Sequence, residues 1–122
     1  MLEFLEKIDK MDYQMGSMPS IGDYNDPNTF FYMWTTKSNI ISTGWSNLKY
    51  DDLVKQAGET VNHEKRIELF KRAEQILLIE DAVVAPLAYR MKVTIRYKYL
   101  NKVMTPLFGA QDFKYAYTYG RE

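Results

Sequence analysis

One amphipathic stretch constrains the fold more than any other feature of this sequence. Between residues 62 and 79, apolar side chains recur every three or four positions and so fall on one side of a helix. The stripe consists of Ile67, Phe70, Ala73, Ile76 and Leu77. Most charged and amide side chains lie off the stripe, and Asn62 is a residue type that caps the beginning of a helix. The pattern predicts one long helix with a buried face.

Three shorter helices are predicted along the chain. Within residues 1–10, apolar residues recur at helical spacing, and the pattern begins without a capping residue, as expected for a cut helix. Pro27 suits the first position of a helix that leads into residues 29–34, with Asp26 as its cap. The last of the three is expected over residues 50–57, where acidic residues in the first turn favour the positive end of the helix dipole.

Alternation of apolar and polar residues predicts a few strands. It is loose over residues 12–18 and clearer over residues 82–89 and 92–99, while the aromatic-rich tail 107–119 has room for one more strand. Residues 19–27 gather Pro, Gly, Asp and Asn and predict a turn-rich loop. Strands that follow a long helix indicate a mixed α/β fold.

Composition narrows the class of protein without naming a function. The 122 residues, 46% of them hydrophobic, suit one compact domain. Lys and Arg number 16 and Asp and Glu number 16, so the net charge is zero and no overall field attracts nucleic acid. The absence of cysteine excludes disulfides, thiolate zinc sites and a cysteine nucleophile. No apolar run has the length of a membrane span, and residues 1–10 do not resemble a signal peptide.

Catalytic motifs are missing from the sequence. It contains no G-x-S-x-G, no phosphate-binding glycine loop and no H-E-x-x-H. The single histidine, His63, falls in the predicted first turn of the long helix, where a role on the helix surface is expected. Sixteen acidic residues offer many carboxylate pairs, but no pattern singles one out for glycoside chemistry. We therefore expect a protein that is not an enzyme and that uses no cofactor.

The turn-rich loop offers a calcium site as an alternative, because Asp23, Asn25 and Asp26 bring oxygen ligands together. An EF-hand loop, however, requires glycine at its sixth position and an acidic residue at its twelfth, where this chain has Asn28 and Trp34. The simpler interpretation is that the Asx side chains cap backbone turns. We therefore predict no metal site.

Four aromatic residues, Phe30, Phe31, Tyr32 and Trp34, crowd into five positions after this loop. They have the chemistry to line a pocket. Four such residues in so short a helix surround it, however, so at least half of them are expected to pack into the core.

Several of these features recur in an order that is specific to one family. In chain order they are Asp23-Tyr24-Asn25-Asp26-Pro27, Thr29-Phe30, Asn39, Gly44-Trp45, Tyr50-Asp51, Arg66, Ala73-Glu74 with Ile76-Leu77, and Ala85-Pro86-Leu87. The ordered set, over roughly residues 12–90, resembles the C-terminal part of the extracellular solute-binding proteins of family 5. These are the oligopeptide- and dipeptide-binding proteins that serve ABC importers.

The resemblance implies an α/β fold that is part of a two-lobed periplasmic-binding-protein clamshell of type II. Residues 1–90 would form the C-terminal portion of the second, peptide-clamping lobe, and residues 91–122 would return toward the first lobe. Family members are several times longer, so the chain would be a fragment. The resemblance also implies an extracytoplasmic location, in the periplasm or as a membrane-anchored lipoprotein, and ABC permease subunits as partners of the full-length protein.

The resemblance places ligand binding in the turn-rich loop. It implies that Asp23 receives the α-amino group of a bound peptide and that Pro19, Ser20, Ile21 and Gly22 pair edge-on with the ligand backbone. A carboxylate there would replace the hydration that an enclosed ammonium group loses. The family commonly has tryptophan at the position of Ser20, and Pro19 has no N–H to donate. A dipeptide, a nickel chelate or a sugar therefore remains an alternative ligand.

A rival hypothesis from another class is an independent small α/β interaction protein related to the family only by descent. Under the family interpretation, Arg66 and Glu74 have a scaffold role on the long helix. Strands at residues 82–89 and 92–99 would then lack partner strands in the isolated chain, so we expect it to self-associate as a dimer.

Overall fold

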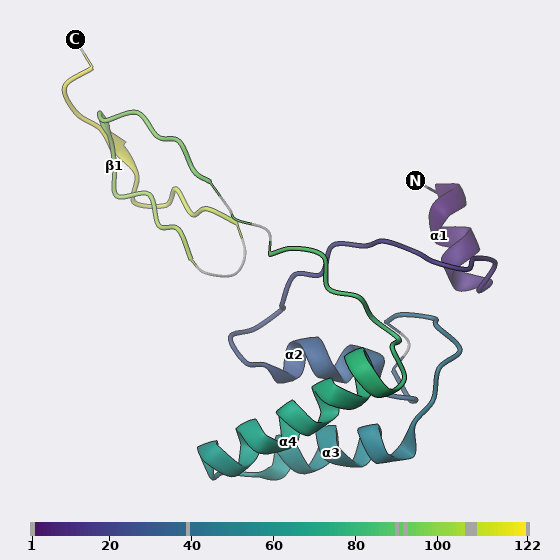
Figure 1. The fold of residues 1–122 in the computed structure, drawn as a ribbon. Helices are drawn as coiled ribbons and strands as arrows, with labels where there is room; N and C mark the ends of the chain where they lie inside the picture. The colour runs from purple at the N-terminus through teal and green to yellow at the C-terminus, as the bar shows by residue number, and fades with distance from the viewer. Residues whose placement is uncertain (1, 39, 90, 92, 107–109, 122) are drawn as a thin grey trace. The chain divides into compact units, whose positions relative to one another are not determined.

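The computed structural model describes residues 2–38, 40–89, 91, 93–106 and 110–121. The chain divides into two compact units, which we call the helical unit (Met1–Ala85) and the hairpin unit (Pro86–Glu122). Figure 1 shows helices in the first and a β-hairpin in the second. The chain is therefore a mixed helix and strand structure with few strands. Within the described residues, no helix has both the length and the apolar character needed to cross a membrane.

The helices of the helical unit agree closely with the periodicity of the sequence. They are α1 (Leu2–Asp9), α2 (Asn28–Phe31) with a 3₁₀ turn (Tyr32–Trp34), α3 (Leu48–Glu59), and α4 (His63–Gln75), which continues as a π-helical turn (Ile76–Glu80). The short connection between α3 and α4 lets these two helices lie side by side (Figure 1).

Asparagine caps fix the beginnings of the two long helices. The side chain of Asn62 accepts from the backbone N–H of Lys65, which confirms the predicted cap of α4. Asn47 accepts from the N–H groups of Lys49 and Tyr50, and α3 therefore begins before the predicted residue 50. Both caps satisfy N–H groups that a helix leaves without partners in its first turn.

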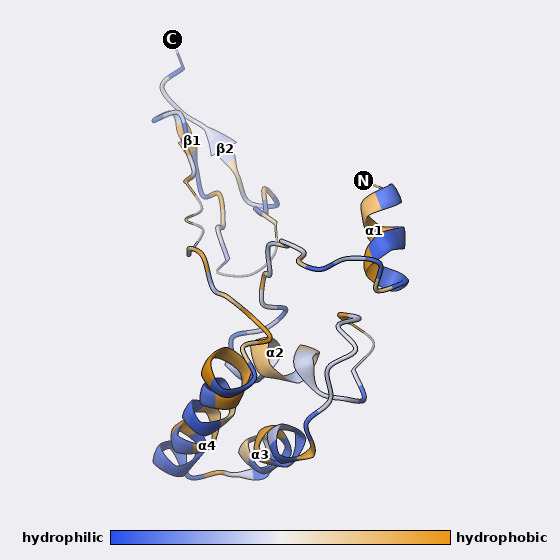
Figure 2. Cartoon of the chain, turned by 45° about the vertical axis from the view of Figure 1, so that its right-hand side comes forward, coloured by the Kyte–Doolittle hydropathy of each residue, from blue (hydrophilic) through white to orange (hydrophobic). Residues whose placement is uncertain are grey.

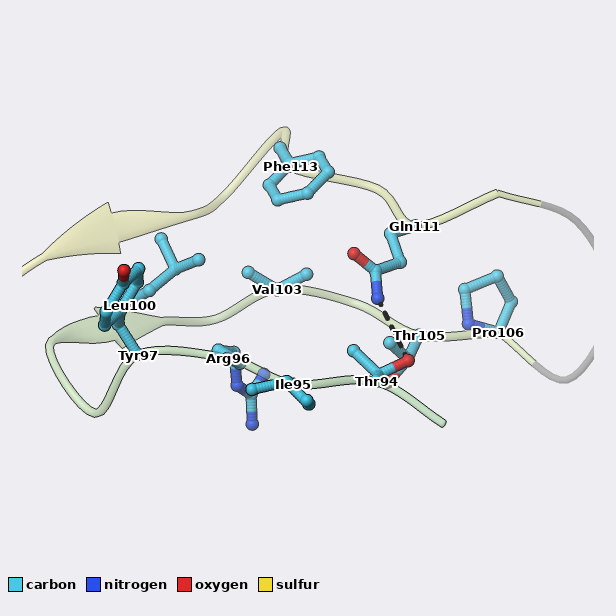
Figure 3. A pocket seen from close by; sticks show the side chains of 10 residues that line it. All are labelled: Thr94, Ile95, Arg96, Tyr97, Leu100, Val103, Thr105, Pro106, Gln111 and Phe113. Carbon is cyan, nitrogen blue, oxygen red and sulfur yellow. Dashed lines mark hydrogen bonds between the residues drawn. The ribbon is translucent and has the colours of Figure 1, made fainter. Parts of the chain in front are cut away.

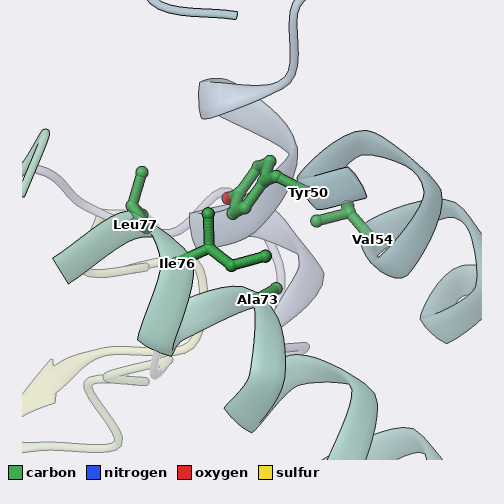
Figure 4. Packing of buried hydrophobic residues seen from close by; sticks show 5 residues of the cluster. All are labelled: Tyr50, Val54, Ala73, Ile76 and Leu77. Atoms are coloured by element: carbon green, nitrogen blue, oxygen red, sulfur yellow. The ribbon is translucent and has the colours of Figure 1, made fainter. Parts of the chain in front are cut away.

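The core of the helical unit lies between α3 and the C-terminal half of α4. Its buried cluster consists of Tyr50, Val54, Ala73, Ile76 and Leu77 (Figure 4). Figure 2 shows the hydrophobic colour concentrated where α4 continues into the π-helical turn, in agreement with this position. Phe70 is also buried, which leaves Ile67 as the one member of the predicted stripe that is exposed, at 38%. The first turn and a half of α4 is exposed at every residue except Arg66. The apolar stripe therefore begins before the part of α4 that neighbouring elements bury.

The hairpin unit is built around a short antiparallel pair. Strand β1 (Leu100–Asn101) pairs with β2 (Tyr117–Thr118), with Leu100 opposite Thr118. Beside this pair, the N–H of Tyr119 donates to the carbonyl of Tyr99 over 2.9 Å, and Met104 forms an isolated bridge with Asp112. The strand predicted in the tail is thus confirmed at its C-terminal part, while residues 107–109 lie outside the described residues.

Three other predicted strands are wrong where the structure describes them. Residues 12–18, 82–89 and the described part of 92–99 form no β-ladder. Many of their apolar side chains are exposed, as with Ile95 at 95%, whereas Val83 and Val84 pack against the core cluster of the helical unit. Alternation gives a segment the pattern of a strand, but pairing requires a second segment, and the described chain supplies none to these three. Lys92, which falls in the predicted strand 92–99, lies outside the described residues.

Candidate functional site

The predicted site residues lie consecutively in the loop that precedes α2. Pro19, Ile21 and Asp23 are exposed, Ile21 at 76%, whereas Gly22 is buried. Ser20 contacts the helical turn that follows α2, since its hydroxyl lies 3.7 Å from the sulfur of Met33. Asp23 is thus exposed on a segment that the buried Gly22 and the contact of Ser20 with Met33 join to the rest of the unit.

The backbone of Asp23 is fixed by Thr29. The Asp23 N–H donates to Oγ1 of Thr29 over 3.0 Å, and Thr29 is only 6% exposed. The Thr29 N–H in turn donates to the carbonyl of Asp26 over 3.2 Å. These two bonds close the turn from Asp23 to Thr29 on itself.

Asp26 connects the same turn to α4. Its Oδ1 accepts from Nη2 of Arg66 over 2.6 Å and from the N–H of Asn28 over 2.8 Å. The Asp26 side chain accepts from the first N–H of α2, but α2 begins at Asn28 with Pro27 as its cap residue, so the predicted cap lies one position too early. The hydrogen bond from Arg66, followed by that from Asn28, lowers the pKa of Asp26, and partial burial opposes the shift. Asp26 is consequently an ionised structural group of the loop.

Arg66 is held on its other side by the two long helices. Its Nε donates to the carbonyl of Ala57 in α3 over 2.9 Å, and its guanidinium lies 5.1 Å from the ring centre of Phe70. Phe70 stacks on Phe31 at a centroid distance of 4.7 Å. Arg66 therefore connects α3, α4 and the loop, which agrees with the scaffold role expected for it. Glu74, the other residue expected to have such a role, is exposed.

These contacts bear on the calcium alternative. One carboxylate oxygen of Asp26 is engaged by a cation and a backbone amide, so the three acidic and amide residues of the loop are not equally available to a metal ion. Among the described residues, no group of three or more His, Cys, Asp or Glu side chains is arranged to hold a metal ion. In contrast to Asp26, Asp23 is exposed, and its side chain is not part of this pairing.

One more acceptor, at the start of α2, has no donor among the described residues. Oδ1 of Asn28 is buried and has no donor within the described residues, while Nδ2 of the same amide donates to the Tyr24 hydroxyl over 3.4 Å. A buried acceptor without a donor is unfavourable, so a donor from water or a ligand would stabilise this amide.

The aromatic residues after the loop divide between core and surface. Phe31 and Trp34 pack against the buried cluster, whereas Phe30 is 44% and Tyr32 is 50% exposed. The expectation that at least half of the four pack into the core is confirmed. His63 is exposed in the first turn of α4, as expected.

A polar contact near the end of α4 was not predicted. Oδ2 of Asp81 accepts from Nε1 of Trp45 over 2.9 Å and from Nδ2 of Asn47 over 2.8 Å. These donors, Asn47 first, lower the pKa of Asp81. Gly44 precedes Trp45 with φ of +69°, a conformation that favours glycine. The Gly44-Trp45 pair was visible in the sequence, but its partner lies 36 positions away from Trp45.

Each unit also has a hollow that the sequence did not indicate. In the helical unit, a hollow of about 370 Å³ is lined largely by hydroxyl-bearing residues between Thr35 and Ser46. In the hairpin unit, a hollow of about 530 Å³ lies between the segment that starts at Thr94 and the hairpin (Figure 3). Ile95, Val103 and Phe113 line it, and Gln111 donates to the hydroxyl of Thr94 over 3.3 Å.

Comparison with known proteins gives consistent relatives. No family model matches the chain. The oligopeptide-binding protein OppA of Bacillus subtilis is 33% identical over 115 residues, and the dipeptide-binding protein DppE of the same organism is 30% identical over 113 residues. Each match covers 93% of this chain. A probable deoxycholate-binding periplasmic protein, YgiS of Escherichia coli, is 26% identical over 105 residues, which is 86% of this chain.

The relatives are considerably longer than the chain. The matches cover 21% of OppA, 21% of DppE and 19% of YgiS, so the chain spans about a fifth of the length of these curated relatives. All three are named as binding proteins.

Proposed function

Because this chain belongs to the family of the oligopeptide- and dipeptide-binding proteins, we propose that it is the part of such a protein that captures the amino terminus of a peptide. In this proposal residues 1–90 form the C-terminal portion of the second lobe of a clamshell, and residues 91–122 return toward the first lobe. The observation that carries it is the exposed carboxylate of Asp23 on a loop that hydrogen bonds hold to α2 and α4.

Asp23 has the chemistry to receive an ammonium group. Closure of two lobes removes water from the ligand, and an ionised carboxylate then replaces the lost hydration through a charge-assisted hydrogen bond. The neighbouring carboxylate of Asp26 already pairs with Arg66, so the two acidic residues of the loop have separate roles. Oδ1 of Asn28, at the start of α2, is a buried acceptor that has no donor among the described residues.

Residues 19–22 are proposed to pair with the ligand backbone. Backbone pairing gives affinity with little dependence on ligand side chains, as in other cases of strand addition. Pro19 has no N–H, so the pairing depends on the N–H groups of Ser20, Ile21 and Gly22 and on carbonyl groups of the segment. The exposed side chain of Ile21 would then contact the ligand or the opposite lobe.

The proposed role is transport without catalysis. The full-length protein would bind its ligand outside the cytoplasmic membrane, in the periplasm or as an anchored lipoprotein, and deliver it to ABC permease subunits. Domain closure around the ligand would distinguish the loaded from the empty receptor for the permease.

Identification of the natural ligand tests this function. Full-length protein carrying this chain should be purified without denaturation, and native mass spectrometry should find peptides released from it. Recovery of peptides, and binding of a synthetic peptide with a free amino terminus, are the expected results. A protein that neither retains nor binds any peptide would contradict the proposal.

A non-peptide ligand is the second candidate, and the similarity to the probable deoxycholate-binding protein YgiS favours it. A sterol acid has no ammonium group and would not need the carboxylate of Asp23. The same mass spectrometry distinguishes the candidates, because a bile acid, a nickel chelate or a sugar differs from a peptide in mass and fragmentation.

The isolated chain is proposed to self-associate. Residues 1–85 carry 14 acidic and 9 basic side chains, whereas residues 86–122 carry 2 acidic and 7 basic ones. Unpaired, exposed residues such as Leu87 and Ile95 add apolar surface to this opposite charge. Light scattering should find a dimer at low salt that weakens as salt increases, whereas a monomer at all salt concentrations would contradict this proposal.

A further inference from the structure

We propose that Arg66 is a positioning residue for the carboxylate of Asp23 and that it acts through Asp26 and Thr29. The inference rests on the ligand-binding role proposed for Asp23. It adds a residue of α4 that supports the site without touching the ligand. Three successive contacts carry the argument.

The first contact fixes the guanidinium of Arg66 to the helices. Its Nε donates to the carbonyl of Ala57, which is fully buried in α3. Its planar group lies over Phe70, which is 5% exposed, with 5.1 Å from Cζ to the ring centre. A hydrogen bond to α3 and a stacking contact within α4 leave the guanidinium little freedom to rotate.

The second contact transfers this fixed position to the loop. Nη2 of Arg66 donates to Oδ1 of Asp26 over 2.6 Å, across 40 positions of sequence. The two side chains are only 22% and 31% exposed, so solvent screens the pair less than it screens an open surface pair. The same oxygen accepts from the N–H of Asn28, which ties the start of α2 to the same point.

The third contact reaches Asp23. Thr29 donates its N–H to the carbonyl of Asp26 and accepts the N–H of Asp23 at Oγ1. Because Thr29 is 6% exposed, water has little access to compete for that hydroxyl. The backbone of Asp23 therefore keeps its place relative to Asp26, and through Asp26 relative to Arg66. A carboxylate on an ordered loop loses less conformational freedom on binding, and this raises affinity.

A second arginine of α4 provides a matched control. Arg72 forms a two-bond ion pair with Glu80, with side-chain exposures of 35% and 38%. Neither partner belongs to the loop. Removing either arginine thus deletes one ion pair from the same helix, but only the loss of Arg66 should release residues 23–29.

The experiment combines hydrogen exchange with ligand affinity in the full-length protein. Arg66→Met and Thr29→Val should speed amide exchange in the segment 23–29 by about tenfold or more, because each loses a hydrogen bond that holds the turn. Both should weaken binding of a peptide with a free amino terminus. Arg72→Met and Thr29→Ser should leave exchange in this segment and peptide affinity unchanged.

The outcomes separate this inference from the proposed function. Unchanged exchange at residues 23–29 in Arg66→Met would overturn the inference. Faster exchange with wild-type affinity would also overturn it, provided that Asp23→Asn weakens binding. If Asp23→Asn itself has no effect on affinity, the ligand-binding role of Asp23 fails, and positioning of that carboxylate fails with it. Should Arg66→Met not fold, Thr29→Val and its control Thr29→Ser provide the same test.

Discussion

The hydroxyl of Tyr50 donates to the backbone carbonyl of Phe31 over 2.7 Å, joining α3 to the end of α2. Tyr50 is fully buried, and its ring meets that of Trp45 edge to face at 5.1 Å. Burial, and to a smaller extent the charge of Asp51, raises the pKa of Tyr50 well above its usual range, so the hydroxyl remains a donor. This bond holds the segment that follows the candidate site against the helical core.

Tyr50→Phe should destabilise the protein by about 1–3 kcal/mol, because the change leaves the partly buried carbonyl of Phe31 without this donor. Denaturant unfolding monitored by circular dichroism measures the change. Tyr32→Phe is the control, since Tyr32 is 50% exposed and should have almost no effect. Equal stability of Tyr50→Phe and the wild type would show that the bond is not formed in solution.

Phe70→Ala should destabilise the protein by about 3–5 kcal/mol, since Phe70 is 5% exposed and stacks on Phe31. Ile67→Ala, one turn earlier, should cost about 1 kcal/mol or less because that side chain is 38% exposed. Thermal or denaturant melts of the two variants decide the matter. A similar cost for both would mean that α4 presents a different face to the core.

Helix periodicity is a local property, and for that reason the sequence predicted α1, α3 and α4 and the cap at Asn62 well. The misplaced strands show the converse. Residues 92–99 alternate in the manner of a strand, but whether they pair depends on a partner segment that alternation does not reveal. The exposure of Ile67 was missed for the same reason, because neighbouring elements decide how much of an apolar helix face is buried.

The loop of the candidate site was predictable from the sequence, but the contacts that hold the loop in place were not. Pro, Gly and Asx residues at 19–27 indicated a turn, and Asp26 was expected at the start of a helix. The partner of Asp26, however, is 40 positions away at Arg66, and the partner of Trp45 is 36 positions away at Asp81. Pairs at such separations arise from the packing of α2 and α3 on α4, which no local pattern contains.

Acidification should lower the free energy of unfolding, partly through protonation of Asp26. Its folded-state pKa lies below the ordinary value of 3.8, so the unfolded chain binds the proton more readily. Stability from this group is therefore complete above that ordinary value and is lost as the pH falls through the folded pKa. Between about pH 5 and pH 2, unfolding free energy should fall more steeply for the wild type than for Asp26→Asn. Parallel curves for the two proteins would contradict the Asp26–Arg66 pairing.

Calorimetric titration of one peptide in two forms, with a free and with an acetylated amino terminus, tests the central claim most directly. In the full-length protein, Asp23→Asn should weaken binding of the free form by roughly tenfold to a hundredfold, the equivalent of a charge-assisted hydrogen bond of about 1.5–3 kcal/mol. Binding of the acetylated form should be almost the same in the wild type and the variant. Equal affinity of the two proteins for the free form would contradict the assignment of Asp23 to the ligand's amino group.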